Sequence, residues 1–277
     1  MLDITGILTR EFVDRLRSGY RDAFHGRAPD HEKQIVENAE QIIQLISGSN
    51  TLYHNIEHTI QVTLVGQTVL QGKMTVDTSI TPELWLNFIM ALLCHDIGYV
   101  AGICHTDQQT SESNASDAVF MSAHIERGKQ FVRDFFSTQP GIDSDFIQDC
   151  IERTRFPVPE DPTYQRTDDY PGLVRGADLI GQLSDPRYIH KLPAVFFEFE
   201  ESGYNEVTGY KQPGDLLESY ADFYQRSVMP YVGETLEYLA MTTMGKTIID
   251  SLEANTHRAR ENSDRNCSQL SVGSRHF

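Results

Sequence analysis

Apolar residues recur along this chain with the spacing of α-helices, and no segment shows the strict alternation typical of strands. From residue 7 to 25 and from 30 to 46 they return every three or four positions, which predicts two amphipathic helices. Loops rich in glycine, proline and polar residues separate these from further segments of the same kind. Those segments are 53–70, 84–94, 117–136, 143–154, 173–183, 185–201, 215–229 and 231–253. The pattern predicts an all-α protein of about ten helices.

The chain contains no evident linker, so we expect one domain over residues 1–254. Residues 1–50 would form an N-terminal helical scaffold, 51–190 the part that carries the chemistry, and 191–254 the C-terminal helices. Residues 255–277 are polar and include several arginines. We expect this last segment to be a frayed terminus.

The most apolar stretch, Leu84 to Tyr99, ends in His95 and Asp96. A helix this apolar is normally buried on most sides, so both side chains would lie beside the core. Burying an unpaired carboxylate costs several kcal/mol or more, so Asp96 requires a cation. A metal ion would meet that requirement. The alternative is a core histidine next to an aspartate that caps the helix.

Other histidines and carboxylates also adjoin apolar helical segments. His54 and His58 are four residues apart and would project from one face of a helix, although such pairs also occur by chance on surfaces. His124 lies inside the segment 117–136, and Asp178 is surrounded by apolar neighbours. Imidazole and carboxylate ligands without cysteine suit zinc, manganese, iron or magnesium. The polar segment 101–116 reads as a long loop, whose His105 could reach such a site or remain solvated.

Composition narrows the choice of partners and compartment. The net charge of −17 argues against nucleic acid or an anionic membrane as a bulk partner. We find neither a run of 18 apolar residues nor a charged-then-apolar leader, so we expect a soluble, cytoplasmic protein. The four cysteines form no CxxC pair and resemble no disulfide framework, which fits reduced thiols.

The order of these residues, H…HD…D, resembles the signature of the HD superfamily of metal-dependent phosphohydrolases. The segment Tyr53 to His58 is similar to the YHNxxH segment of the cyclic-nucleotide phosphodiesterases. Gly176 to Pro186 is similar to their segment around the last metal-binding aspartate. His124 to Gly128 resembles the HxxxG element by which some bacterial HD phosphodiesterases hold a second metal. Together these motifs span residues 53 to about 190, half of the chain.

The resemblance implies an all-α, HD/PDEase-like helical bundle that hydrolyses a phosphomonoester or phosphodiester, with a nucleotide as the expected substrate. One or two divalent ions, drawn from Mg, Mn, Zn, Fe, Co and Ni, would serve as cofactor. Asp96 would bridge the ions where two are bound, and His54 would be the general acid that protonates the leaving oxygen. The implied metal ligands are His58, His95, Asp96 and Asp178, with His124 as a further candidate.

The sequence also departs from the phosphodiesterases. They have a further histidine shortly after HD, where this chain has Ile97-Gly98-Tyr99, and their purine-binding glutamine has no clear counterpart. Cyclic-nucleotide specificity is therefore not implied. Arg155 and Arg175 are the nearest basic residues in sequence and could hold a substrate phosphate or form surface ion pairs. Two other functions stay open, a di-iron HD-type oxygenase and a non-catalytic HD signalling module, and so does a homodimer.

Overall fold

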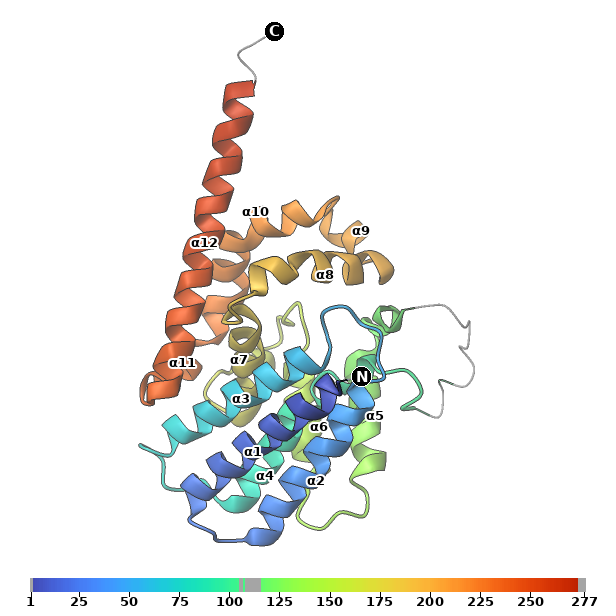
Figure 1. Cartoon of the computed structure of the whole chain (residues 1–277), viewed down its shortest axis with the longest axis vertical. Coiled ribbons are helices and arrows are strands. Elements are labelled where there is room, and N and C mark those ends of the chain that lie inside the picture. The colour runs from blue at the N-terminus through green and yellow to red at the C-terminus, as the bar shows by residue number, and fades with distance from the viewer. Residues whose placement is uncertain (1, 105–106, 108–115, 274–277) are drawn as a thin grey trace.

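The computed structural model describes residues 2–104, 107 and 116–273, with side chains up to residue 261. The described residues form α-helices and short helical turns without a strand, which confirms the expected all-α fold (Figure 1). The helices are α1 (Ile4–Phe24), α2 (Pro29–Ile46), α3 (Ile56–Lys73), α4 (Pro82–Cys94), α5 (His124–Phe135), α6 (Ser144–Arg153), α7 (Tyr170–Leu183), α8 (Tyr188–Glu201), α9 (Tyr204–Thr208), α10 (Pro213–Phe223), α11 (Gly233–Ala240) and α12 (Thr243–Gly273). Two 3-10 turns, η1 (Ile97–Tyr99) and η3 (Asp117–Phe120), lie between α4 and α5.

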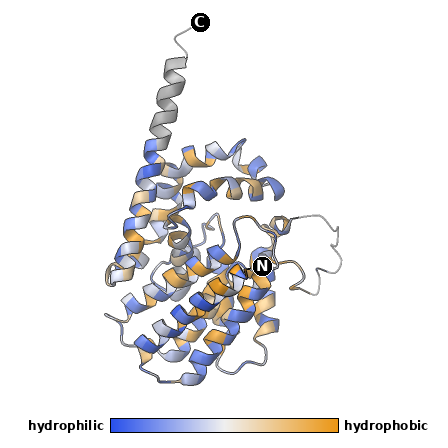
Figure 2. Ribbon diagram, in the orientation of Figure 1, coloured by the Kyte–Doolittle hydropathy of each residue, from blue (hydrophilic) through white to orange (hydrophobic). Residues whose placement is uncertain are grey.

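Helix α4 lies at the centre of the bundle, as its apolar sequence predicts. Its backbone begins at a proline, and Thr81 caps it by accepting a hydrogen bond from the Leu84 amide at 3.1 Å. Every side chain from Trp85 to Cys94 is buried. Helices α2, α3, α6 and α7 pack around it and present their apolar faces inward (Figure 2).

The closest helix pairing brings two predicted site residues together. Helix α3 packs on α7 at Gly181, where a Cβ atom would lie only 2.9 Å from the Cα atom of Val62. This crossing places the start of α3, with His58, beside Asp178 in the middle of α7. A second close approach fixes the turn after α4, because a Cβ atom on Gly98 would lie 1.8 Å from the carbonyl oxygen of His124.

Two predicted helices begin later than expected. Asn55 caps α3, its side-chain oxygen accepting from the Glu57 amide at 2.9 Å, so His54 precedes the helix. The expectation that His54 and His58 share one helical face is therefore wrong. The segment 117–136 is likewise divided into η3 and α5, and His124 is the first residue of α5.

The C-terminal helix is longer than its composition suggests. Helix α12 continues to Gly273, so the expected frayed tail from residue 255 is wrong for this segment. Asn255 is fully buried and donates hydrogen bonds to the carbonyl oxygens of Leu183 and Asp185, at 2.8 and 2.6 Å. These bonds attach α12 to the end of α7, and a polar residue thereby becomes part of the interior.

Helices α8, α9 and α10 form a separate layer on the side of the bundle away from α1 and α2 (Figure 1). A hydrogen bond from Ser202 Oγ to Met121 Sδ, 3.3 Å long, connects the end of α8 to the segment before α5. Among the described residues, no helix combines the length and apolarity that crossing a bilayer requires.

Candidate metal centre and adjoining pocket

Four of the predicted ligands converge on one point. The Nε2 atoms of His58 and His95 lie 3.2 Å apart, and Asp96 Oδ2 lies 3.1 Å from each of them. Asp178 Oδ1 lies 3.4 Å from the His58 nitrogen and 3.6 Å from the His95 nitrogen. Residues from the start of α3, the end of α4 and the middle of α7 thus present donor atoms to one site. The structure thus groups His58, His95 and Asp178 where they could hold one ion, and Asp96 lies outside this group of three. The four-ligand site stays a prediction.

These spacings fit a coordinated ion. Ligand atoms held about 2.0–2.2 Å from one metal are separated from each other by roughly 2.8–3.6 Å in octahedral or tetrahedral geometry. The distances among His58, His95 and Asp178 fall within that interval, as do those from Asp96 to the two histidines. His58, His95 and Asp178 form the group whose donor atoms all lie within 4.8 Å of one another. The donor set of two imidazoles and two carboxylates suits a divalent ion such as Mn, Fe, Zn or Mg. The residues therefore fit the metal that the sequence motifs imply.

The surroundings orient the ligands. His95 is fully buried, and its Nδ1 lies 2.7 Å from the carbonyl oxygen of Leu92, one turn earlier in α4. Donation from Nδ1 to that oxygen leaves the Nε2 lone pair directed at the site, as metal-binding histidines require. The chain leaves the helix at Asp96, which allows two adjacent residues to reach the same point.

The two aspartates remain ionised in this site. Burial raises the pKa of both Asp96 and Asp178, but the histidines beside them have the larger combined effect and hold both pKa values below the usual range. Two half-buried carboxylates with this preference carry negative charge that a cation would balance.

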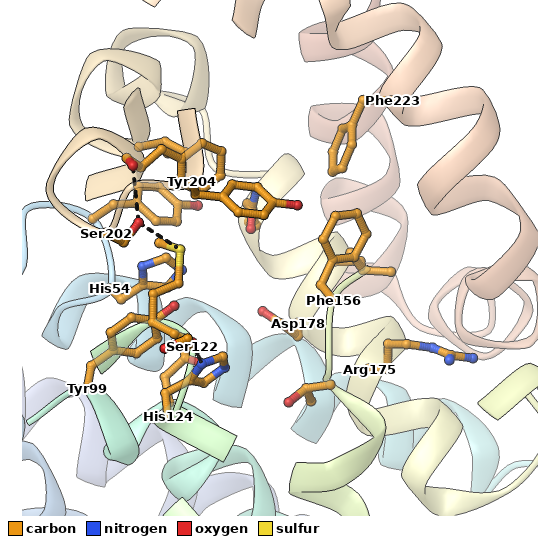
Figure 3. Close-up of a pocket in the computed structure, with 18 residues that line it drawn as sticks. His54, Tyr99, Ser122, His124, Phe156, Arg175, Asp178, Ser202, Tyr204 and Phe223 are labelled. Carbon is orange, nitrogen blue, oxygen red and sulfur yellow. Dashed lines mark hydrogen bonds between the residues drawn. The ribbon is translucent and has the colours of Figure 1, made fainter. Parts of the chain in front are cut away.

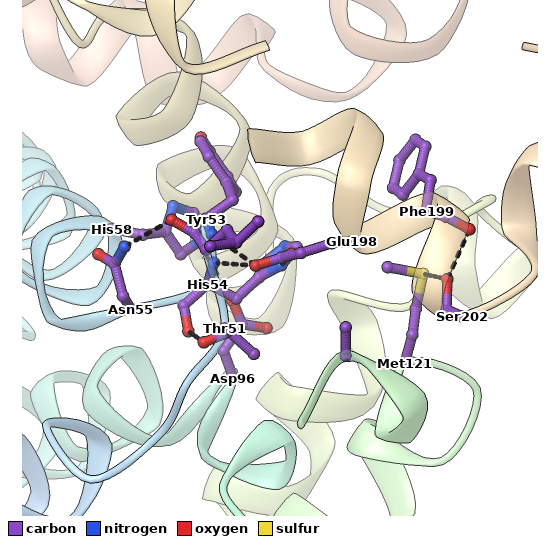
Figure 4. Close-up of polar contacts among 12 residues, drawn as sticks. Thr51, Tyr53, His54, Asn55, His58, Asp96, Met121, Glu198, Phe199 and Ser202 are labelled. Carbon is purple, nitrogen blue, oxygen red and sulfur yellow. Dashed lines mark hydrogen bonds and ion pairs between the residues drawn. The ribbon is translucent and has the colours of Figure 1, made fainter. Parts of the chain in front are cut away.

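His54 lies at the edge of the same site and has a dedicated carboxylate partner. Its Nδ1 lies 2.5 Å from Glu198 Oε2, and the backbone amides of Tyr53 and His54 donate to Glu198 Oε1 (Figure 4). Glu198 comes from α8 and is fully buried. Burial of the His54 ring opposes protonation, but the charge and hydrogen bond of Glu198 outweigh it and raise the pKa of His54 to about 9. The ring is therefore protonated at neutral pH.

Tyr99 separates His54 from His124. Its ring stacks on His54 with centroids 4.5 Å apart and on His124 at 4.6 Å. The His124 Nδ1 lies 2.5 Å from the carbonyl oxygen of Met121, which leaves Nε2 as the atom available to a ligand. Burial lowers the pKa of His124, so its ring is neutral at pH 7. His124 lies outside the compact group of His58, His95 and Asp178, and its role as a further ligand stays a prediction.

A pocket of about 320 Å³ opens beside the metal-binding residues (Figure 3). His54, Asp96, Tyr99, His124 and Asp178 form its polar side. The other side is contributed by the loop after α6 and by α7, α8, α9 and α10. The remaining lining residues are Tyr53, Met121, Ser122, Thr154, Phe156, Arg175, Leu179, Gln182, Val195, Phe199, Ser202, Tyr204 and Phe223.

The two predicted phosphate-binding arginines have other partners. Arg155 forms ion pairs with Glu152 and Glu126, at 2.6 and 2.8 Å, and does not line the pocket. Arg175 does line it, but its guanidinium group extends away from Asp178 (Figure 3). The structure thus places neither guanidinium group beside the candidate metal ligands. His105 lies outside the described residues.

Several side chains of the site carry no motif in the sequence. Glu198 lies among other acids near the end of α8, yet it follows buried Val195 by three residues and shares its apolar face. That spacing is the signal by which it could be found. Phe156 and Phe223 come from segments far apart in sequence, so no local pattern indicates that their rings meet. Glu57 pairs with Arg187 and with Lys191, so it has no role among the ligands.

Comparison with known proteins gives a family and no further identification. A family model described as Npun_R2479-like matches residues 2–262, and the chain belongs to that family. The match covers both the candidate metal ligands and α8, which carries Glu198. No curated protein matches the chain.

Proposed function

We propose that this member of the Npun_R2479-like family is a metal-dependent phosphohydrolase that acts on a phosphomonoester or phosphodiester. The grouping of His58, His95 and Asp178, with Asp96 3.1 Å from both histidines, carries the proposal, because these separations match the edges of a metal coordination polyhedron. When bound, a divalent ion would lower the pKa of water to near neutrality and offset the negative charge of a phosphoryl group.

The chain's own residues divide the remaining work. The two histidines and two aspartates would hold the cofactor beside the pocket. His54 lines the same pocket and is kept protonated by Glu198, so it donates a proton from Nε2 to the leaving oxygen. A water oxygen bonds to phosphorus as the bond from phosphorus to the leaving oxygen breaks, and the protonated leaving group departs as a neutral alcohol. Tyr99 packs against the His54 ring and maintains its orientation.

The site itself also favours a group-transfer role over a purely structural metal. Structural zinc sites use four protein ligands and exclude substrate. Here Asp96 and Asp178 line a pocket of about 320 Å³, so the cofactor position is accessible to a small molecule. An acidic group beside a metal at the base of a pocket is the arrangement that phosphoester hydrolysis requires.

The test begins with chelator-treated protein reloaded separately with Mn, Mg, Zn, Fe, Co and Ni. Each form is assayed with p-nitrophenyl phosphate, bis(p-nitrophenyl) phosphate and a panel of nucleotides. We expect release of phosphate or nitrophenol that requires metal and disappears in His58→Ala. Lack of hydrolysis by every metal-loaded form would overturn the proposal. Oxygen consumption by a coloured, iron-loaded form would instead favour the oxygenase alternative.

A further inference from the structure

Part of the pocket lining is apolar. Phe156 and Phe223 meet edge to face, with ring centroids 5.9 Å apart, although one follows α6 and the other ends α10 (Figure 3). Three further apolar side chains from α7 and α8 also line the pocket, namely Leu179, Val195 and Phe199. We refer to these five residues as the apolar wall.

Phe156 leaves much of its ring uncovered. It is 45% exposed while lining the pocket, so the apolar wall offers aromatic surface to a bound molecule. Small-molecule sites commonly combine such a surface with a few polar groups that fix orientation. In this pocket His54, Asp96 and Asp178 supply the ionised groups at the proposed metal site, and the neutral polar groups come from Ser122, Thr154, Gln182, Ser202 and Tyr204.

Positive charge is scarce along the wall. Arg175 is the only lysine or arginine among the pocket residues that the structure describes. Its guanidinium donates to the carbonyl oxygens of Tyr164 and Arg166, at 2.6 and 3.1 Å, and lies 4.2 Å from the centroid of the Tyr231 ring. Two of its nitrogens are thus engaged with protein groups, and its buried Nε has no hydrogen-bond partner.

A second anionic group on a substrate would therefore find no cation along the wall other than Arg175, whose guanidinium extends away from Asp178 and stacks on Tyr231. Transferring a charge from water to apolar surroundings without a partner is strongly unfavourable. Covering the exposed Phe156 ring and its neighbours with an apolar group is favourable in proportion to the area removed from water. Both effects favour a substrate whose organic group is uncharged and apolar.

We propose, resting on the phosphohydrolase function above, that the substrate is a phosphoester whose organic group is uncharged and largely apolar. The phosphoryl group lies at the four ligands, and the organic group lies against the apolar wall. Esters with further phosphate or carboxylate groups, nucleoside triphosphates included, are poor substrates. Phe156, the most exposed residue of the apolar wall, is the residue that determines specificity for the organic group.

Three non-hydrolysable phosphonates separate the two effects. Methylphosphonate, benzylphosphonate and 4-carboxybenzylphosphonate share the phosphonate group. Benzylphosphonate adds a phenyl ring, and 4-carboxybenzylphosphonate adds a negative charge to that ring. Their dissociation constants are measured by calorimetry on Mn-loaded protein. We expect benzylphosphonate to bind roughly 10- to 100-fold more tightly than methylphosphonate. The added carboxylate should weaken binding at least about tenfold.

A charge placed on the wall should reverse the second preference. Phe156→Arg should bind 4-carboxybenzylphosphonate more tightly than benzylphosphonate. The matched control is Phe197→Arg, which adds the same charge at a phenylalanine of α8 that is 50% exposed and does not line the pocket. It should keep the wild-type order of the three ligands.

The outcomes distinguish this inference from the function on which it rests. If benzylphosphonate binds no better than methylphosphonate, or the carboxylate improves binding to wild type, the inference about the organic group is overturned. If metal-loaded protein binds none of the three phosphonates, the proposed phosphohydrolase function fails, and the inference fails with it.

Discussion

Glu198 Oε2 lies 2.5 Å from His54 Nδ1, and the other oxygen of the same carboxylate accepts the backbone amides of Tyr53 and His54. One buried side chain on α8 thereby fixes both the position and the charge of a histidine 144 residues earlier. This contact connects the α8–α10 layer to the metal-binding part of the bundle. Protonated His54 is what distinguishes the proposed catalytic site from a site that only binds metal.

The first prediction concerns the pH dependence of hydrolysis. His54 acts in its protonated form, which exists below its pKa of about 9, so activity is lost as pH rises through that value. Glu198→Gln removes the charge that raises this pKa and should move the loss of activity about 1–2 pH units lower. The measurement is kcat against pH for an alkyl phosphoester.

The control for this prediction is Glu201→Gln, which removes one charge from an exposed position at the end of α8. It should leave the pH profile unchanged. An unaltered profile in Glu198→Gln, with the fold intact by circular dichroism, would show that this carboxylate does not set the charge of His54.

The second prediction separates the proton donor from the metal ligands. His54→Ala should retain its metal and lose roughly 10²–10⁴-fold in rate with an alkyl leaving group. The loss should be smaller for p-nitrophenyl phosphate, because nitrophenolate departs without a proton. His58→Ala should lose metal and activity together, whatever the leaving group. Metal loss in His54→Ala would mean that His54 is itself a ligand.

The third prediction concerns the contact between α12 and the end of α7. Asn255→Ala removes the side-chain amide that donates to the carbonyl oxygens of Leu183 and Asp185, so both buried oxygens lose this hydrogen bond. We expect a loss of about 2 kcal/mol in the free energy of unfolding. Since a chain of this size loses about 2–4 °C per kcal/mol, the melting temperature should fall by about 4–8 °C.

Glu253→Ala, at an exposed position two residues earlier on α12, is the control and should melt within about 2 °C of wild type. An equal, small effect of both substitutions would contradict the claim that the helix beyond residue 254 belongs to the folded domain.

The sequence predicted that these polar side chains would meet because burial makes isolated polar groups conspicuous. His95, Asp96 and Asp178 stand out within apolar helices, and the physical requirement for a partner predicts that they meet. Their convergence depends on one helix crossing and one helix end, and both are encoded locally by small residues at Gly181 and Gly98.

Other parts of the site depend on contacts that local patterns do not encode. Glu198 resembles the solvent-exposed acids beside it, and only the position of α8 against the start of α3 makes it a partner of His54. The apolar wall likewise forms where a loop meets the end of α10. Asn255 was assigned to a polar tail because composition cannot distinguish a solvated amide from one that donates to buried carbonyls.

The central claim is that His58, His95, Asp96 and Asp178 together hold a divalent ion, and metal stoichiometry tests it most directly. Chelator-treated protein is dialysed against each divalent metal in turn, and bound metal per chain is measured by elemental analysis in wild type, His58→Ala and Asp178→Ala. Asp77→Ala, which removes an acid that pairs with Lys73, is the control. The account predicts one or two ions per chain in wild type and the control, and close to none in the two ligand variants. Equal metal content in all four proteins, or none in wild type with any metal, would contradict it.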